Sequence, residues 1–170
     1  MLAGVQDYSH TLAEPAWLTK LRTQAVADYA VLALPTFEKI NYRNWPLLDV
    51  QAPTVISDPG ITEELSARGA EANFYAVGDT TVRVALPDEA LAAGVVLCDL
   101  RTAVREHADL LRANLFQRAL KPDTDKLTAL NAALMTNGFF LYVPQNVVLD
   151  TPLEILQLVD QRQPQNYVQH

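Results

Sequence analysis

Residues 130–155 read LNAALMTNGFFLYVPQNVVLDTPLEI, and this stretch decides which kind of fold the chain can adopt. It begins as the end of an apolar helix, passes through Asn137-Gly138 and continues as an apolar run at 139–143. Glycine or asparagine in a left-handed conformation is the residue that commonly ends a helix. The stretch therefore predicts a helix that ends near Asn137, followed by a strand at 139–143.

The remainder of this stretch predicts further beta structure. A turn signal at 144–146 separates the first strand from a second apolar run at 147–149, which we also read as a strand. At residues 153–159 the local signals conflict, because Thr151-Pro152 is typical of a helix start while the apolar residues fit a short buried strand. The local residues alone leave helix and strand open there.

Three helices are predicted upstream of the tail. The first runs from 15 to 32 with a proline in its first turn, and its apolar side chains recur at helical spacing. The second begins after Asp99, whose carboxylate can cap it, and runs to about residue 120. The third starts near Asp123 or Thr124. The apolar stripe of the first helix consists of Leu18, Leu21, Ala25, Tyr29 and Leu32.

Residues 36–59 carry three prolines and no periodicity, so the sequence predicts an irregular segment. Large apolar side chains are nevertheless frequent in it. We expect an ordered loop that packs these side chains on the core, and the alternative is an exposed docking patch. The side chains are Phe37, Ile40, Tyr42, Trp45, Leu47 and Leu48.

The middle of the chain predicts a small β element. Residues 74–77 and 81–86 flank Gly78-Asp79, and the second run alternates apolar with polar or small residues. These features indicate a hairpin. A third apolar run at 95–98 follows a glycine and leads into the second helix.

Composition excludes several classes of protein. The chain has 170 residues, of which 49% are hydrophobic and 19% charged, so a disordered chain is excluded. Thirteen basic residues against 20 acidic ones give a formal charge of −7, which argues against a nucleic-acid partner. The single cysteine, Cys98, excludes an intrachain disulfide and suits a reducing compartment. The N-terminus lacks a secretory signal and no apolar run is long enough to span a membrane, so we expect a cytoplasmic protein without membrane contact.

A search for reactive groups yields structural interpretations throughout. Cys98 ends an apolar run, and His107 lies on the apolar stripe of the second helix, so both are expected to pack in the core. Asn131 lies on a stripe that should be buried and is expected to tie the third helix to the loop after it. Each acidic pair opens or precedes a predicted helix, where negative charge interacts favourably with the helix dipole. The remaining candidates are His10, His170 and the acidic pairs Glu63-Glu64, Asp88-Glu89 and Asp123/Asp125. We assign no catalytic, cofactor-binding or metal-binding residue.

The tail nevertheless carries a recognisable signature. Residues 130–138 match the pattern LNxAxxxxG, and residues 141–153 match IYVPxxVxxxxPI with leucine at both isoleucine positions. Both patterns resemble the SufB/SufD family of iron–sulfur cluster assembly proteins, and SufD more closely than SufB. The helix at 17–35, the aromatic stretch through Trp45-Pro46-Leu47 and the run at 94–100 are also similar to this family.

The resemblance implies an α+β architecture in two parts. Residues 1–137 would form a mainly helical N-terminal domain with a small β element. Residues 138–170 would form the first rung or rungs of a right-handed parallel β-helix, truncated at His170, which favours strand over helix at 153–159. Family members are more than twice as long as this chain, so the resemblance implies an N-terminal fragment.

The resemblance also implies a function. The family's role is that of a non-catalytic partner in a SufB–SufC–SufD type complex, which builds iron–sulfur clusters through regions mostly beyond this chain. It therefore transfers no site residue and no cofactor to this chain. A homodimer through the exposed β-helix edge is a further expectation, because free strand edges recruit other strands. The alternatives are a free-standing interaction module and, from the beta-like tail alone, a β-helix carbohydrate-active enzyme.

Overall fold

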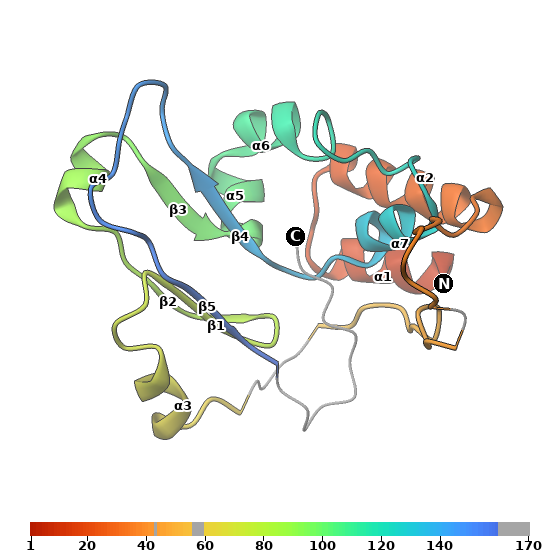
Figure 1. The fold of residues 1–170 in the computed structure, drawn as a ribbon, viewed down its shortest axis with the longest axis horizontal. Coiled ribbons are helices and arrows are strands. Elements are labelled where there is room, and N and C mark those ends of the chain that lie inside the picture. The colour runs from red at the N-terminus through yellow and green to blue at the C-terminus, as the bar shows by residue number, and fades with distance from the viewer. Residues whose placement is uncertain (43, 56–59, 160–170) are drawn as a thin grey trace. The chain divides into compact units, whose positions relative to one another are not determined.

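The computed structural model describes residues 1–42, 44–55 and 60–159 of the chain. It divides into two compact units, each built from two separate stretches of sequence. Unit 1 consists of Met1–Val55 and Asp109–Met135, and unit 2 of Ile56–Ala108 and Thr136–His170. The described residues are helical in unit 1 and mixed in unit 2 (Figure 1). The β-helix and the division at 137/138 stay predictions.

Unit 1 is built from α1 (Leu2–Thr11), α2 (Ala16–Val31), most of α6 (Ala108–Asn114) and α7 (Lys126–Leu134). Helix α2 packs against both α1 and α7 (Figure 1). The helix predicted at 15–32 is confirmed by α2, whose N-cap is Pro15. Helix α1 is not among the predicted helices, although its Val5 and Tyr8 are buried at a spacing typical of a helix.

A buried charged network joins three helices of unit 1. The Arg22 guanidinium, 2% exposed, donates from Nη2 to Glu14 Oε1 at 2.7 Å and from Nε to Glu14 Oε2 at 2.8 Å. Its Nη1 donates to the Ala133 carbonyl of α7 at 3.1 Å. Ser9 Oγ of α1 donates to Glu14 Oε2 at 2.8 Å, and the Arg22 guanidinium lies 5.3 Å from the centre of the Tyr8 ring. Arg22 thus ties α2 to α1, to the α1–α2 turn and to α7.

Unit 2 contains a three-stranded sheet in the order β2-β1-β5 (Figure 1). Strands β1 (Phe74–Val77) and β2 (Thr80–Val84) are antiparallel, and β5 (Ile155–Leu158) is parallel to β1. Gly78 has φ +58° in the turn between β1 and β2, a conformation that glycine adopts without a steric penalty. The predicted hairpin is confirmed, and so is the strand expected at 153–159.

The central strand β1 is buried on both faces, which explains its uninterrupted apolar sequence. Tyr75 and Val77 share one core cluster with Leu65 of α3 (Glu63–Arg68), whereas Phe74 and Ala76 belong to a second cluster. Tyr75 is completely buried, and its hydroxyl donates to the Leu65 carbonyl at 2.6 Å. The Tyr75 ring therefore links α3 to the sheet.

A second, two-stranded sheet pairs β3 (Val96–Asp99) antiparallel with β4 (Phe139–Tyr142). Asp99 caps α5 (Leu100–Glu106) by accepting from Thr102 N at 2.9 Å, as expected from the sequence. The apolar run before Asp99 and the strand predicted at 139–143 are likewise confirmed by β3 and β4. Among the described residues, unit 2 also contains helix α4 (Asp88–Ala92).

Three local expectations are wrong. The single helix expected from Asp99 to about 120 is broken at His107, which has φ −127° and stacks on Phe140 at 6.1 Å between ring centres. The helix before Asn137 ends in extended backbone at Met135 (φ −52°, ψ 129°), and neither Asn137 nor Gly138 has a positive φ. Residues 147–149 have no strand pairing among the described residues and so form no strand.

Candidate interaction surface

The aromatic loop, residues 34–49, follows α2 in unit 1. Its described residues form no helix or strand, which confirms the irregular segment expected from the prolines. Short backbone bonds shape it: Trp45 N donates to the Tyr42 carbonyl at 2.9 Å, and Asp49 N to the Pro46 carbonyl at 3.3 Å. The loop is thus a chain of turns rather than an extended connection.

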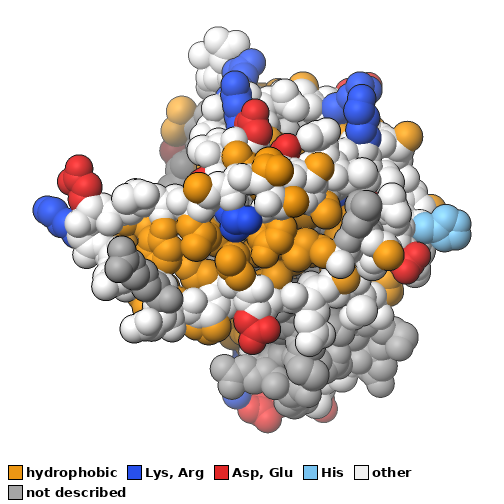
Figure 2. Space-filling model, turned by 90° about the vertical axis from the view of Figure 1, so that its right-hand side faces the viewer, with side chains coloured by type: hydrophobic (Ala, Val, Ile, Leu, Met, Phe, Trp, Pro, Cys, Tyr) orange, Lys and Arg blue, Asp and Glu red, His pale blue; other side chains and the backbone are white. Residues whose placement is uncertain are grey.

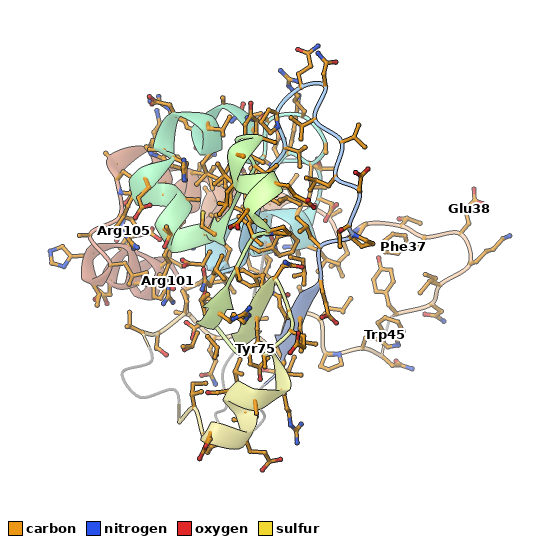
Figure 3. The ribbon with its side chains drawn as sticks, turned by 90° about the vertical axis from the view of Figure 1, so that its left-hand side faces the viewer. Phe37, Glu38, Trp45, Tyr75, Arg101 and Arg105 are labelled. Atoms are coloured by element: carbon orange, nitrogen blue, oxygen red, sulfur yellow. The ribbon has the colours of Figure 1, made fainter. Side chains whose placement is uncertain are left out.

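Four of the six large apolar side chains of this loop are exposed, and Tyr42 and Leu47 are half-buried, so the prediction that all six pack on the core is wrong. Trp45 is 59% exposed, Ile40 52%, Phe37 48% and Leu48 40%. Figure 3 shows Phe37 and Trp45 on the two arms of the loop and Glu38 near its tip. Figure 2, which views the molecule from the right-hand side of Figure 1, shows hydrophobic side chains gathered in a broad band. The alternative, an exposed docking patch, is the interpretation that fits these exposures.

Aromatic contacts within the loop hold it in shape. Phe37 and Tyr42 meet edge to face, with ring centres 5.8 Å apart and planes at 75°. The Tyr42 hydroxyl donates to the Pro35 carbonyl. These contacts surround a hollow of about 970 Å³ that the loop residues line. A loop ordered before binding loses less conformational entropy when a partner docks.

Lys126 anchors the chain where the aromatic loop begins. Its ammonium donates to the Tyr29 carbonyl at 2.6 Å and lies 4.6 Å from the centre of the Tyr29 ring. Its backbone N–H donates to the Ala33 carbonyl at 2.9 Å, just before the loop. A cation beside the last carbonyls of a helix is electrostatically favourable, so Lys126 stabilises the end of α2. Asp125 in turn caps α7 through Leu127 N at 2.8 Å.

Charge divides unevenly between the two units. Unit 1 contains eight acidic and eight basic residues, and unit 2 contains twelve acidic and five basic residues. The whole formal charge of −7 therefore belongs to unit 2. The aromatic loop itself contains two acidic and two basic residues, so it has no formal net charge.

Unit 2 has an exposed apolar strand of its own. Three side chains of β4 and the side chain of Val143, which follows it, are exposed. Among the described residues, β4 pairs only with β3. An apolar strand with a free edge is a template for pairing with another strand. The further β-helix strands and the homodimer through an exposed β-helix edge stay predictions. The exposed side chains are Phe139 (37%), Leu141 (39%), Tyr142 (37%) and Val143 (40%).

Cys98 lies in β3, is 8% exposed and behaves as a core residue. Burial, together with the carboxylates of Asp99 and Glu106, raises the pKa of its thiol to about 11, and Arg105 partly opposes this shift. Figure 3 shows Arg105 on the same helix as Arg101. The thiolate is the reactive form, so this environment suppresses nucleophilic and metal-binding chemistry at Cys98.

We expect the folded protein to alkylate slowly at Cys98. Raising the thiol pKa from 9.0 to about 11 lowers the thiolate fraction near pH 8 roughly a hundredfold. Iodoacetamide labelling followed by mass spectrometry measures this, with the urea-unfolded chain as the control. Equal labelling rates for folded and unfolded chain would contradict the buried placement.

The other sequence candidates also take structural positions. Glu63 and Glu64 lie in the first turn of α3, and Asp88 and Glu89 in that of α4, as expected for helix starts. Asp125 is the N-cap of α7, His10 is exposed in the last turn of α1, and His170 lies outside the described residues. Within the described ranges, no three potential metal ligands lie together. No described helix is both long and apolar enough to cross a bilayer.

Sequence reasoning missed a buried polar cluster in unit 2. Asp79, 3% exposed, accepts from Arg101 Nη2 at 2.6 Å, and its carbonyl accepts from Asn137 Nδ2 at 2.8 Å. Asn137 thus ties the segment before β4 to the β1–β2 turn, and Asn131, of which a loop tie was expected, is half-buried. The pairing is not visible in the sequence because the three residues are far apart in it. The cluster joins the β1–β2 turn to α5 and to the segment before β4.

Comparison with known proteins gives consistent matches. The family described as "SufBD protein N-terminal region" matches residues 69–155. The iron–sulfur cluster assembly protein SufD of Bacillus subtilis is 35% identical over 160 residues, covering 88% of this chain and 37% of that protein. SufB of Bacillus subtilis is 24% identical over 170 residues, covering 88% and 36%. The SufBD family protein ABCI9 of Arabidopsis thaliana is 27% identical over 171 residues, covering 82% and 35%.

These matches cover only part of each relative, and the family match covers only part of this chain. The chain spans a little over one third of the length of these curated relatives. The family match at 69–155 includes every strand of unit 2 except the last residues of β5. The aromatic loop lies before it, so the match itself assigns the loop no role.

Proposed function

The chain belongs to the SufB/SufD family of iron–sulfur cluster assembly proteins, and we propose from this premise that it is a non-catalytic component of the SUF machinery. In this proposal it acts in the cytoplasm, bound to SufB-like and SufC-like proteins, and the cluster is the cargo of that complex. The observation that carries the proposal is the family match over residues 69–155. Its 35% identity to a SufD supports a SufD-like place in the complex.

The exposed apolar surfaces support a role through protein contact. Trp45 in unit 1 and the β4 residues in unit 2 expose large hydrophobic side chains that a partner could cover. Aromatic residues are enriched among the side chains that dominate binding energy at protein interfaces. We therefore assign the aromatic loop to partner contact within the assembly complex.

A genetic experiment tests the proposed function. Deleting the gene in its own organism should lower the activity of iron–sulfur enzymes in cell extracts, and the wild-type gene should restore it. Enzymes without clusters, assayed in the same extracts, control for general effects on growth. Unchanged activity of the iron–sulfur enzymes after deletion would refute the proposal.

Trp45→Ala tests the role of the aromatic loop. Because Trp45 is 59% exposed, the free energy of unfolding should change by less than about 1 kcal/mol, whereas binding to the partner should weaken about thirtyfold. Chemical denaturation and a titration with the purified partner measure the two effects. Leu91→Ala in α4 is a matched control, since Leu91 is 57% exposed outside the loop. A large loss of stability with unchanged partner affinity would show that Trp45 belongs to the core after all.

A further inference from the structure

A groove in unit 1, here called the α2 groove, runs along the face of α2 that does not enter the helical core. The core side of α2 buries Leu18, Arg22 and Ala25. The groove side chains of α2 recur at helical spacing and so share one face. They are Trp17, Lys20, Leu21, Gln24 and Asp28. This face extends over twelve residues, or about 17 Å of helix.

The opposite wall of the α2 groove comes from the segment that joins α6 to α7. Its apolar floor is buried, with Leu115 6% and Phe116 5% exposed. Phe116 has φ +56°, which is unfavourable for a bulky residue and is maintained by its packing. Together with half-buried Trp17 and Leu21, these side chains line a space of about 740 Å³. The groove thus combines a fixed apolar floor with an open side.

The rim of the α2 groove carries three exposed cations from three different segments. They are Lys20 on α2, Arg112 on α6 and Lys121 in the connection to α7. In the part of the chain that the structure describes, none of the three makes an ion pair or hydrogen bond. The carboxylate of Asp28, which lines the same groove, accepts instead from Gln24 Nε2 at 2.9 Å. The cations therefore remain available to a ligand.

We propose that the α2 groove binds an acidic, amphipathic helical segment of another protein. The apolar floor would take the apolar face of that helix, and the three cations would pair with its carboxylates. Asp28 and Asp123 line the same groove, so its cations do not form the continuous basic stripe that the phosphates of a nucleic acid need. The proposal rests on the groove's geometry and charge, and it is independent of the proposed role in cluster assembly.

Tryptophan fluorescence tests this binding directly. Trp45→Phe leaves Trp17 as the only tryptophan of the chain, so its emission reports on the groove. The probe is a synthetic amphipathic peptide of about 15 residues, with leucine on one face and glutamate on the other. We expect a saturable shift of Trp17 emission that weakens at high ionic strength. The matched peptide with lysine in place of every glutamate should bind at least tenfold more weakly, by roughly 1.4 kcal/mol or more.

Charge reversal on the rim separates groove binding from other outcomes. In the Trp45→Phe background, Lys20→Glu with Lys121→Glu should abolish the shift, while Arg68→Glu in unit 2 should leave it unchanged. Equal binding of both peptides, no shift with the acidic peptide, or retained binding in the double variant would each overturn the proposal. A shift produced equally by inorganic phosphate or by single-stranded RNA would also overturn it, since the groove would then recognise phosphate rather than an acidic helix.

Discussion

Arg22→Ala is expected to lower the free energy of unfolding by about 3–5 kcal/mol. The substitution removes both hydrogen bonds to Glu14 and leaves its carboxylate, 7% exposed, without its cation. It also removes the bond to the Ala133 carbonyl and so the direct tie from α2 to α7. Breaking a buried pair by deleting one partner is costly because the remaining charge stays desolvated. Chemical denaturation followed by circular dichroism measures the loss.

Arg68→Ala supplies the matched control for this prediction. Arg68 pairs with Glu64 at 2.9 Å, but the two side chains are 58% and 80% exposed, so the pair should contribute at most about 0.5 kcal/mol. Arg22→Met combined with Glu14→Leu should recover part of the loss, since no buried charge is then unpaired. Equal small effects of Arg22→Ala and Arg68→Ala would show that Arg22 is not part of a buried network.

Tyr75→Ala is expected to cost a similar amount, about 3–5 kcal/mol. The ring is completely buried between the sheet and α3, so its removal leaves a cavity in the core of unit 2. The Gly69 backbone packs directly against this ring, because a Cβ atom added at Gly69 would lie only 2.0 Å from Tyr75 Cγ. The helix α3 would also lose the bond from the Tyr75 hydroxyl to the Leu65 carbonyl.

Tyr75→Phe separates the ring from its hydroxyl. The variant keeps the packing and loses one hydrogen bond, so it should cost about 1 kcal/mol. Burial raises the pKa of Tyr75, partly opposed by Arg68, so the folded state favours the protonated hydroxyl. Stability from this group is present below pH 10 and falls as the pH rises above it, and Tyr75→Phe should remove that dependence. Denaturation midpoints at several pH values check both points, and a loss with Tyr75→Phe as large as with Tyr75→Ala would contradict the packing role of the ring.

Features encoded by neighbouring residues were predictable from the sequence. The start of the helix that Asp99 caps, Gly78 in the hairpin turn and the boundaries of α2 each depend on a few adjacent side chains. Local chemistry is sufficient for such elements because caps and turns are satisfied within a few residues. The strand at 155–158 was correct only through the family resemblance, since its partner β1 is distant in sequence.

Features that depend on distant partners were missed. Arg22 stands among Lys20, Thr23 and Gln24, and nothing near it in the sequence shows that the fold brings Glu14 and Ala133 to it. The burial of the side chains in the aromatic loop was predicted wrongly for a different reason. An irregular segment has no periodicity that distinguishes buried side chains from exposed ones. Its prediction rested on the general tendency of large apolar residues to be buried, and Trp45 departs from that tendency.

The central claim is that this SufB/SufD family member works through complex formation with SufB-like and SufC-like proteins. Co-expression with those two proteins from the same genome, followed by size-exclusion chromatography with light scattering, tests it most directly. The claim predicts one species that contains all three chains at a fixed stoichiometry. Elution of this chain alone, under conditions in which the SufB-like and SufC-like proteins bind each other, would contradict it.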